Sequence, residues 1–182
     1  MKKNITEKII FAGYGGQGIL FMGKVLANAA MLDGKSVTWI PSYGAEVRGG
    51  TAYSMVVISD DKIASPIVTA MTSCVVMNQL SFNKYLNRIQ PGGLLVVNAS
   101  LVTGLSKAKH IVIAKVKATD IASKLGNLKV ANMVMLGGYL AMTKIVAVRS
   151  VEASLENMIS QSNPDLLKLN ITAFKKGVSA LK

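Results

Sequence analysis

Short apolar runs and helical repeats alternate along most of this chain. Four runs, at residues 9–12, 73–77, 94–97 and 110–114, have the continuous apolar character of strands buried on both faces of a parallel sheet. A Pro-Gly-Gly turn is predicted at residues 91–93. Elsewhere apolar residues recur at helical spacing. The helices predicted from this spacing cover residues 19–29, 80–88, 118–125, 130–148, 151–159 and 165–181.

Two other segments complete the predicted sheet. Residues 36–40 form a strand, and residues 51–58 alternate well enough to form another. A turn at Asp60 and Asp61, followed by residues 62–64, predicts a return strand and hence an antiparallel hairpin. The pattern predicts an α/β fold: a three-layer sandwich with a mainly parallel mixed sheet that includes this antiparallel hairpin, and a helical C-terminal third. No repeat or long linker divides the sequence, so residues 1–182 are expected to form a single domain.

The first buried strand leads into a turn made mostly of glycine, with the sequence GYGGQG at residues 13–18. Glycine tolerates positive φ and lets other groups approach the backbone, and the following helix begins with free N–H groups. The spacing matches a dinucleotide fingerprint, but the acidic residue expected at the end of the next strand is missing, because Asp33 precedes that strand. A tight structural turn, a dinucleotide site and a contact with a phosphate or partner chain all remain open.

A second candidate segment is the predicted loop at residues 41–50, PSYGAEVRGG. The planar guanidinium of Arg48 is suited to a phosphate or a carboxylate. Alternatively, Glu46 and Arg48 pair with neighbouring residues and hold the loop. Because Glu46 has no second carboxylate or histidine in its motif, general acid–base catalysis is not expected, and no catalytic residue is assigned.

The net charge of +12, from 21 Lys and Arg against 9 Asp and Glu, suits an acidic partner, a nucleotide-bearing ligand or nucleic acid. Nucleic acid is the weakest of these, because no known motif is present and aromatic residues do not alternate with the basic ones. The basic residues near the last strand are expected to form a solvated edge: Lys107, Lys109, Lys115 and Lys117.

Cysteine and histidine are too scarce for an ordinary metal centre. The chain has one of each, Cys74 and His110, which argues against a zinc or iron–sulfur site on this chain alone. A single cysteine within an apolar run also suits a reducing cytoplasm. The most apolar stretch, residues 131–148, contains Asn132 and Lys144, so a buried helix is expected there rather than a membrane span.

Five segments together resemble one protein family. They are GYGGQGI at residues 13–19, PSYGAEVRGG at 41–50, SDDKIASPIV at 59–68, LGN at 125–127 and ANMVMLGGYL at 131–140. In this order they resemble the gamma subunit of the 2-oxoacid:ferredoxin oxidoreductases over nearly the whole chain. The chain departs from the family at Ala45, where the family usually has proline, and little loss of role is expected from that change.

The resemblance implies a complex that oxidatively decarboxylates a 2-oxoacid, forms its acyl-CoA and passes electrons to ferredoxin, with 2-oxoglutarate as the favoured substrate. It places thiamine diphosphate, Mg²⁺ and 4Fe–4S clusters on partner subunits, namely thiamine-binding alpha and beta chains and a ferredoxin-like delta chain. Coenzyme A is a co-substrate, and no cofactor or metal is expected on this chain. The alternatives are an independent nucleotide-binding oxidoreductase and a beta-type subunit of indolepyruvate oxidoreductase.

The same resemblance suggests which residues face a ligand or a partner. Matching motif positions are expected to form the coenzyme A or interchain surface: Gly15, Gly16, Gln17, Tyr43, Glu46 and Arg48.

Overall fold

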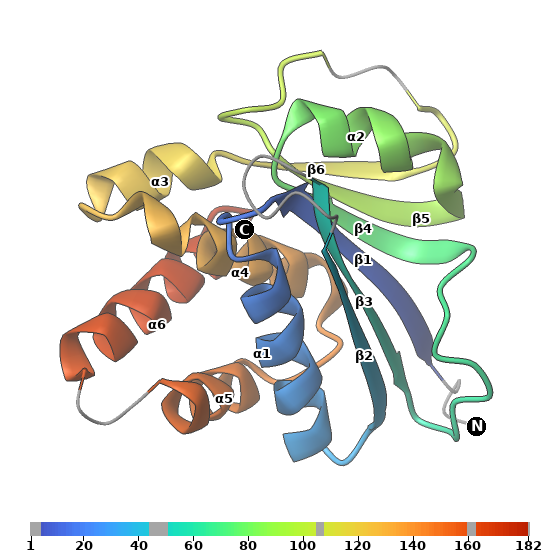
Figure 1. The fold of residues 1–182 in the computed structure, drawn as a ribbon, viewed down its shortest axis with the longest axis horizontal. Helices are drawn as coiled ribbons and strands as arrows, with labels where there is room; N and C mark the ends of the chain where they lie inside the picture. The colour runs from blue at the N-terminus through green and yellow to red at the C-terminus, as the bar shows by residue number, and fades with distance from the viewer. Residues whose placement is uncertain (1–4, 44–50, 105–107, 160–162, 182) are drawn as a thin grey trace.

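A mixed sheet forms the centre of the molecule in the computed structural model, which describes residues 5–43, 51–104, 108–159 and 163–181 (Figure 1). Within these ranges six strands lie in the order β2-β3-β1-β4-β5-β6. β3 is antiparallel to both of its neighbours, and all other pairs are parallel. The strands are β1 Thr6–Tyr14, β2 Ser36–Tyr43, β3 Thr51–Ser59, β4 Met71–Val76, β5 Ile89–Asn98 and β6 Val112–Val116.

Helices cover the two faces of the sheet unequally (Figure 1). On one side lie α1 Ile19–Leu32, α3 Ala118–Lys124, α4 Ala131–Thr143, α5 Val148–Met158 and α6 Pro164–Ser179. The other side carries the short helix α2 Gln79–Tyr85. Each side has its own apolar cluster against the sheet, with Phe11 and Tyr139 in the larger one and Cys74 and Phe82 in the smaller. The predicted three-layer α/β fold with a helical C-terminal third is confirmed. No helix in the described ranges has both the length and the apolar character that crossing a bilayer requires.

The antiparallel part of the sheet is confirmed, but the predicted hairpin partner is wrong. Residues 62–64 form no strand, because β1 and β2 already occupy both edges of β3. The turn is attached to the sheet by a hydrogen bond from the Asp60 amide to the Ile5 carbonyl, 3.1 Å long. Ile63 packs on the α2 side of the sheet instead of pairing with β3. The antiparallel neighbours along the chain are therefore β2 and β3.

Two strands run into segments that were predicted to be a loop and a turn. β2 continues past Pro41 to Tyr43, and proline is tolerated there because β2 is an edge strand. β5 begins at Ile89 and includes the Pro-Gly-Gly segment, where its pairing with β4 shifts register between Met71 and Ser73. A Cβ on Gly93 would lie 2.6 Å from the Thr72 carbonyl oxygen, so the close approach of the two strands depends on this glycine.

The predicted helix over residues 130–148 is two elements. α4 ends at Thr143, and Lys144 adopts a left-handed conformation with φ 50° and ψ 28°. This break turns the chain so that Ile145 and Val146 become buried before α5 begins at Val148. The apolar spacing continued across the break because these two residues are also part of the core, which is why the sequence suggested one helix.

On the α2 side, Tyr85 is a buried phenol with basic neighbours. The Lys84 ammonium lies 5.4 Å from the Tyr85 ring centroid and the Arg88 guanidinium carbon 5.6 Å from it, while the Tyr53 ring centroid is 6.4 Å away. Burial raises the pKa of Tyr85 to about 12, with smaller raising effects from Cys74 and Tyr53.

This pKa predicts a loss of stability in alkaline solution. Above the ordinary tyrosine pKa of about 10, the unfolded chain releases the phenol proton while folded Tyr85 keeps it, so unfolding becomes more favourable as the pH rises towards about 12. Denaturant titrations at successive pH values should show this fall, and Tyr85→Phe should reduce its slope. Part of the slope should persist, because burial also raises the pKa of Tyr139. An unchanged slope in Tyr85→Phe would contradict the assignment.

Candidate functional site at the glycine turn

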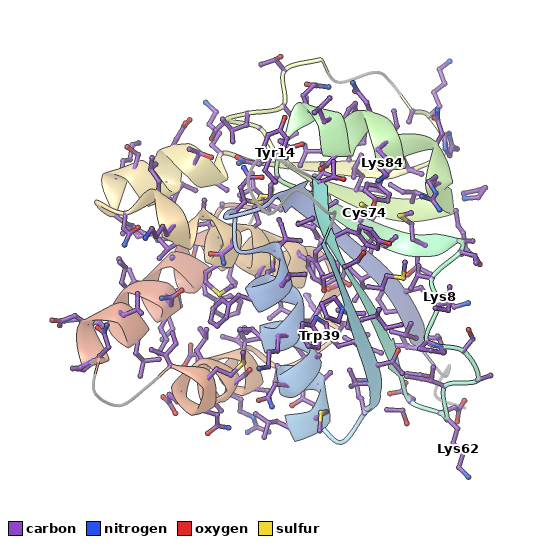
Figure 2. The ribbon with its side chains drawn as sticks, in the orientation of Figure 1. Lys8, Tyr14, Trp39, Lys62, Cys74 and Lys84 are labelled. Carbon is purple, nitrogen blue, oxygen red and sulfur yellow. The ribbon has the colours of Figure 1, made fainter. Side chains whose placement is uncertain are left out.

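The glycine turn is held in place by one side chain of its own. The Gln17 Oε1 atom accepts hydrogen bonds from the Tyr14 amide at 2.7 Å and from the Asn78 Nδ2 atom at 3.1 Å. Asn78 follows β4 and caps α2 by accepting from the Ser81 amide at 2.9 Å. The turn after β1 is thereby fixed to the element that follows the neighbouring parallel strand. Figure 2 places Tyr14 at one end of the sheet and Lys62 at the other.

Two glycines of the turn have backbone angles that disfavour other residues. Gly16 has φ 92° and Gly18 has φ 72°. Gly18 also touches α4, since its carbonyl accepts from Asn132 Nδ2 at 3.2 Å and an added Cβ would lie 2.2 Å from that nitrogen. Gly16 has open space where a Cβ would be, so its backbone is accessible to another molecule.

Two hollows lie against this turn, and Gly16 lines both. One, of about 280 Å³, is bounded by Gln17, Thr119 and Lys129, with an apolar floor of Met77, Leu101, Leu128 and Ala131. The other, of about 330 Å³, has mostly apolar walls formed by the turn and the start of α1, together with Ala52 of β3. Only the first combines a cation and a hydroxyl with the open glycine backbone.

Asn98, at the end of β5, positions the hydroxyl of the first hollow. The fully buried Asn98 side chain donates to Thr119 Oγ1 at 2.8 Å and to the Met77 carbonyl at 3.4 Å. It also accepts from the Ser100 and Thr119 amides at 3.3 and 3.4 Å. Because the Thr119 hydroxyl is an acceptor in its bond with Asn98, its own proton remains available to a ligand oxygen.

Asp33 has a structural partner far from this edge. Its carboxylate accepts from the Ala147 amide at 2.7 Å and from the Ser150 hydroxyl, at the beginning of α5. An acidic residue at a helix start satisfies free backbone N–H groups and interacts favourably with the helix dipole. Asp33 therefore ties the end of α1 to the beginning of α5, and it does not supply the ribose contact of a dinucleotide site.

The structure describes some of the residues predicted to form the site, and others lie outside the described residues. Gly15, Gly16 and Gln17 lie together at the turn, whereas Glu46, Arg48 and the side chain of Tyr43 lie outside the described residues. The backbone of Tyr43 pairs with Ala52, which pairs with Gly13 in β1. Tyr43 and Thr51, on either side of residues 44–50, are therefore at the same edge of the sheet as the turn.

Three further residues at this edge, Thr119, Lys129 and Asn132, were not found from the sequence. In the sequence, Asn132 stood out only as a polar residue in a predicted apolar helix. Thr119 and Lys129 have no local signal, because they approach the turn through the packing of α3 and α4 against the sheet.

These features define a class of protein: an α/β domain that presents a glycine turn and hydrogen-bond donors at the carboxyl edge of a mixed sheet. Residues 8–180 match the family described as pyruvate ferredoxin/flavodoxin oxidoreductase. The chain belongs to this family and is of its gamma-subunit type, as the sequence motifs predicted.

Individual relatives agree with this assignment. The 2-oxoglutarate synthase subunit KorC of Methanocaldococcus jannaschii is 36% identical over 181 residues, which cover 98% of this chain and 95% of that protein. The pyruvate/ketoisovalerate oxidoreductases common subunit gamma of Thermococcus litoralis is 32% identical and covers 84% of this chain and 86% of its own length. The crystal structure of a keto/oxoacid ferredoxin oxidoreductase gamma subunit from Geobacter sulfurreducens superposes with a TM-score of 0.82 at 30% identity, covering 96% of this chain and 98% of the other.

Proposed function

We propose that this chain is the gamma subunit of a 2-oxoglutarate:ferredoxin oxidoreductase, which converts 2-oxoglutarate to its acyl-CoA and passes the electrons to ferredoxin. The match to a 2-oxoglutarate synthase subunit along nearly the full length of both chains supports this substrate. In this proposal thiamine diphosphate, Mg²⁺ and 4Fe–4S clusters lie on the partner subunits. The partners are thiamine-binding alpha and beta chains and a ferredoxin-like delta chain.

The substrate is recognised mainly by those partners. The Thermococcus litoralis relative is described as a subunit common to pyruvate and ketoisovalerate oxidoreductases, so one gamma chain serves two substrates in that organism. Residues 1–182 act as a single domain in this account, since the family match extends almost from end to end. A cytoplasmic location fits the free, buried Cys74.

In this proposal the chain contributes to the binding of coenzyme A. The observation that carries this proposal is the hollow shared by Gly16, Gln17, Thr119 and Lys129. Coenzyme A is an elongated polyanion, and the hollow offers it an open glycine backbone, a free hydroxyl proton and an ammonium group. The net charge of +12 attracts such a ligand before contact. The glycine turn, Tyr43 at the end of β2, and Glu46 and Arg48 just beyond it in sequence form the coenzyme A or interchain surface.

Lys129→Gln is expected to raise the KM for coenzyme A about threefold to tenfold in the assembled complex, because one charged contact to phosphate is lost. The KM for the 2-oxoacid should not change. Lys124→Gln is the matched control, since Lys124 is an equally exposed lysine of α3 that does not line the hollow. Steady-state kinetics with each substrate varied in turn measure both constants. Equal effects of the two substitutions would indicate a general charge effect and contradict the site.

Arg48→Ala tests the motif at residues 41–50, PSYGAEVRGG. It is expected either to raise the KM for coenzyme A by about tenfold, as the loss of a bidentate phosphate contact would, or to weaken assembly with the partner subunits. Size-exclusion chromatography of the reconstituted complex and the same kinetic assay distinguish the two outcomes. If assembly and KM were both unchanged, Arg48 would have no part in the surface.

A further inference from the structure

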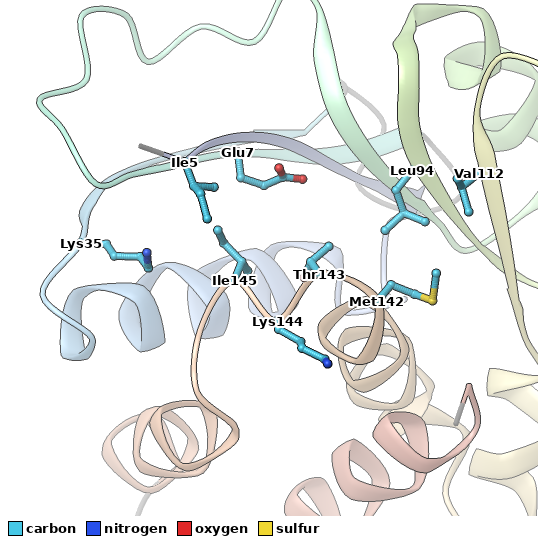
Figure 3. Close-up of a pocket in the computed structure, with 9 residues that line it drawn as sticks. All are labelled: Ile5, Glu7, Lys35, Leu94, Val112, Met142, Thr143, Lys144 and Ile145. Atoms are coloured by element: carbon cyan, nitrogen blue, oxygen red, sulfur yellow. The ribbon is translucent and has the colours of Figure 1, made fainter. Parts of the chain in front are cut away.

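A separate hollow of about 350 Å³ is drawn in Figure 3. Glu7, which lines it, is near the start of β1, whereas the glycine turn follows the end of that strand. Apolar side chains form its walls: Leu94 of β5, Val112 of β6, Met142 of α4, and Ile145, which follows the break at Lys144. Glu7 of β1 and Lys144 also line it. Its volume is near the lower end of the range of small-molecule sites, about 300–1,000 Å³, so it suits a small ligand.

The Glu7 carboxylate is arranged as a hydrogen-bond acceptor. The Ser73 hydroxyl donates to the buried Tyr139 hydroxyl at 3.3 Å, and the Tyr139 hydroxyl donates to Glu7 Oε1, also at 3.3 Å. Tyr139 keeps its proton because burial raises its pKa well above the ordinary value. Glu7 forms no ion pair with any described residue. A ligand that approaches Glu7 must therefore bring a donor, and preferably a positive charge.

Lys144 is at the mouth of the same hollow in an unusual conformation. Among the described residues it alone has positive φ without being glycine. Glycine would adopt this backbone conformation without strain, but the chain has a lysine there. The exposed Lys144 side chain points away from Glu7 and makes no ion pair within the described chain (Figure 3). The other lysine of the hollow, Lys35, is already paired with Asp60 at 2.6 Å.

We propose that this hollow binds a free aliphatic α-amino acid. Its ammonium group bonds to Glu7, its carboxylate pairs with Lys144, which swings across the mouth, and its side chain packs on Leu94, Val112 and Met142. An aliphatic amine would satisfy Glu7 and leave Lys144 without a partner. An aliphatic acid would place its carboxylate in a pocket that already contains the Glu7 carboxylate, and the two negative charges would repel each other. Only a ligand with both charges on an apolar body complements all three features.

The test is binding of L-leucine to the full chain, measured by isothermal titration calorimetry. Isopentylamine lacks the carboxylate and 4-methyl-2-oxopentanoate lacks the ammonium group, and each is expected to bind at least tenfold more weakly than L-leucine. Glu7→Gln keeps an acceptor for Tyr139 but removes the charge, so it should weaken L-leucine binding about tenfold. Lys144→Gly should weaken binding by a similar factor while leaving the thermal midpoint unchanged or higher, because glycine relieves the backbone strain.

The Lys144→Gly variant separates ligand binding from folding, since a damaged fold would lower the midpoint. The absence of saturable heat with L-leucine would overturn the proposal. So would equal affinity for isopentylamine or for 4-methyl-2-oxopentanoate, because one of the two charged contacts would then be unnecessary. Neither result bears on the coenzyme A surface, which is at the other end of the sheet.

Discussion

Replacing Gly177 with alanine is expected to destabilise the folded chain by about 3 kcal/mol, the upper end of the usual cost of overpacking and a large share of the ~5–15 kcal/mol typical of a domain. Gly177 is in α6 where that helix crosses α4. An added Cβ would lie 2.0 Å from the Val134 carbonyl oxygen and 2.8 Å from its carbon. These are backbone atoms of a buried helix, so they cannot move aside as the end of a side chain would. The reciprocal contact is equally close, since a Cβ on Gly137 would lie 2.1 Å from the Phe174 carbonyl oxygen.

The direction of the stability change in Gly177→Ala identifies its cause. In an exposed helix, glycine to alanine stabilises by about 1 kcal/mol, so a loss at position 177 reports the crossing and not helix propensity. Thermal denaturation should show a midpoint about 10 °C lower. Gly104→Ala is the control, because the nearest atoms to its added Cβ are at 3.8 Å or more and both belong to the Gln79 side chain. A Gly177→Ala midpoint equal to that of the control would mean that the helices do not cross as described.

Gly18→Ala is expected to cost about 2–4 kcal/mol and to disturb the glycine turn itself. Two causes add. Position 18 has φ 72°, which strains any residue with a Cβ, and the new methyl group would lie 2.2 Å from Asn132 Nδ2. Relief of that contact requires Asn132 to move, which breaks its 3.2 Å hydrogen bond to the Gly18 carbonyl.

The two causes can be separated with a double-mutant cycle. In an Asn132→Ala background the steric contact is absent, so Gly18→Ala should cost only the backbone strain, about 1–2 kcal/mol. Urea denaturation of the four proteins gives the coupling energy. Additive effects would show that Asn132 does not touch the turn.

The sequence was informative wherever local pattern and tertiary packing agree. The run at residues 9–12 is buried in the middle of the sheet as β1, and helices begin and end near the predicted points where glycine or proline marks a boundary, as at Gly126 and Pro164. The glycine turn was also recognisable, because positive φ at Gly16 and Gly18 leaves glycine as the natural choice.

It was uninformative where a neighbouring element decides the conformation. Pro91 and two glycines look like a turn, yet they belong to β5, in a segment across which the pairing with β4 shifts register. Apolar periodicity continues through Lys144, although the chain reverses there to bury Ile145. Lys129, which lines the hollow at the glycine turn, becomes part of the site only when α4 docks on the sheet. Lys129 is far along the chain from Gly16 and Gln17, and local pattern does not encode a contact of that kind.

We propose that this chain completes an enzyme complex whose reactive groups are on partner subunits. The most direct test is purification of the tagged chain from its native cells, with identification of the co-purifying proteins and a 2-oxoacid oxidation assay on the complex and on the isolated chain. The account predicts recovery of thiamine-binding and cluster-binding subunits, activity in the complex and none in the isolated chain. Turnover of a 2-oxoacid by the isolated chain, or a redox centre bound to it, would contradict the account.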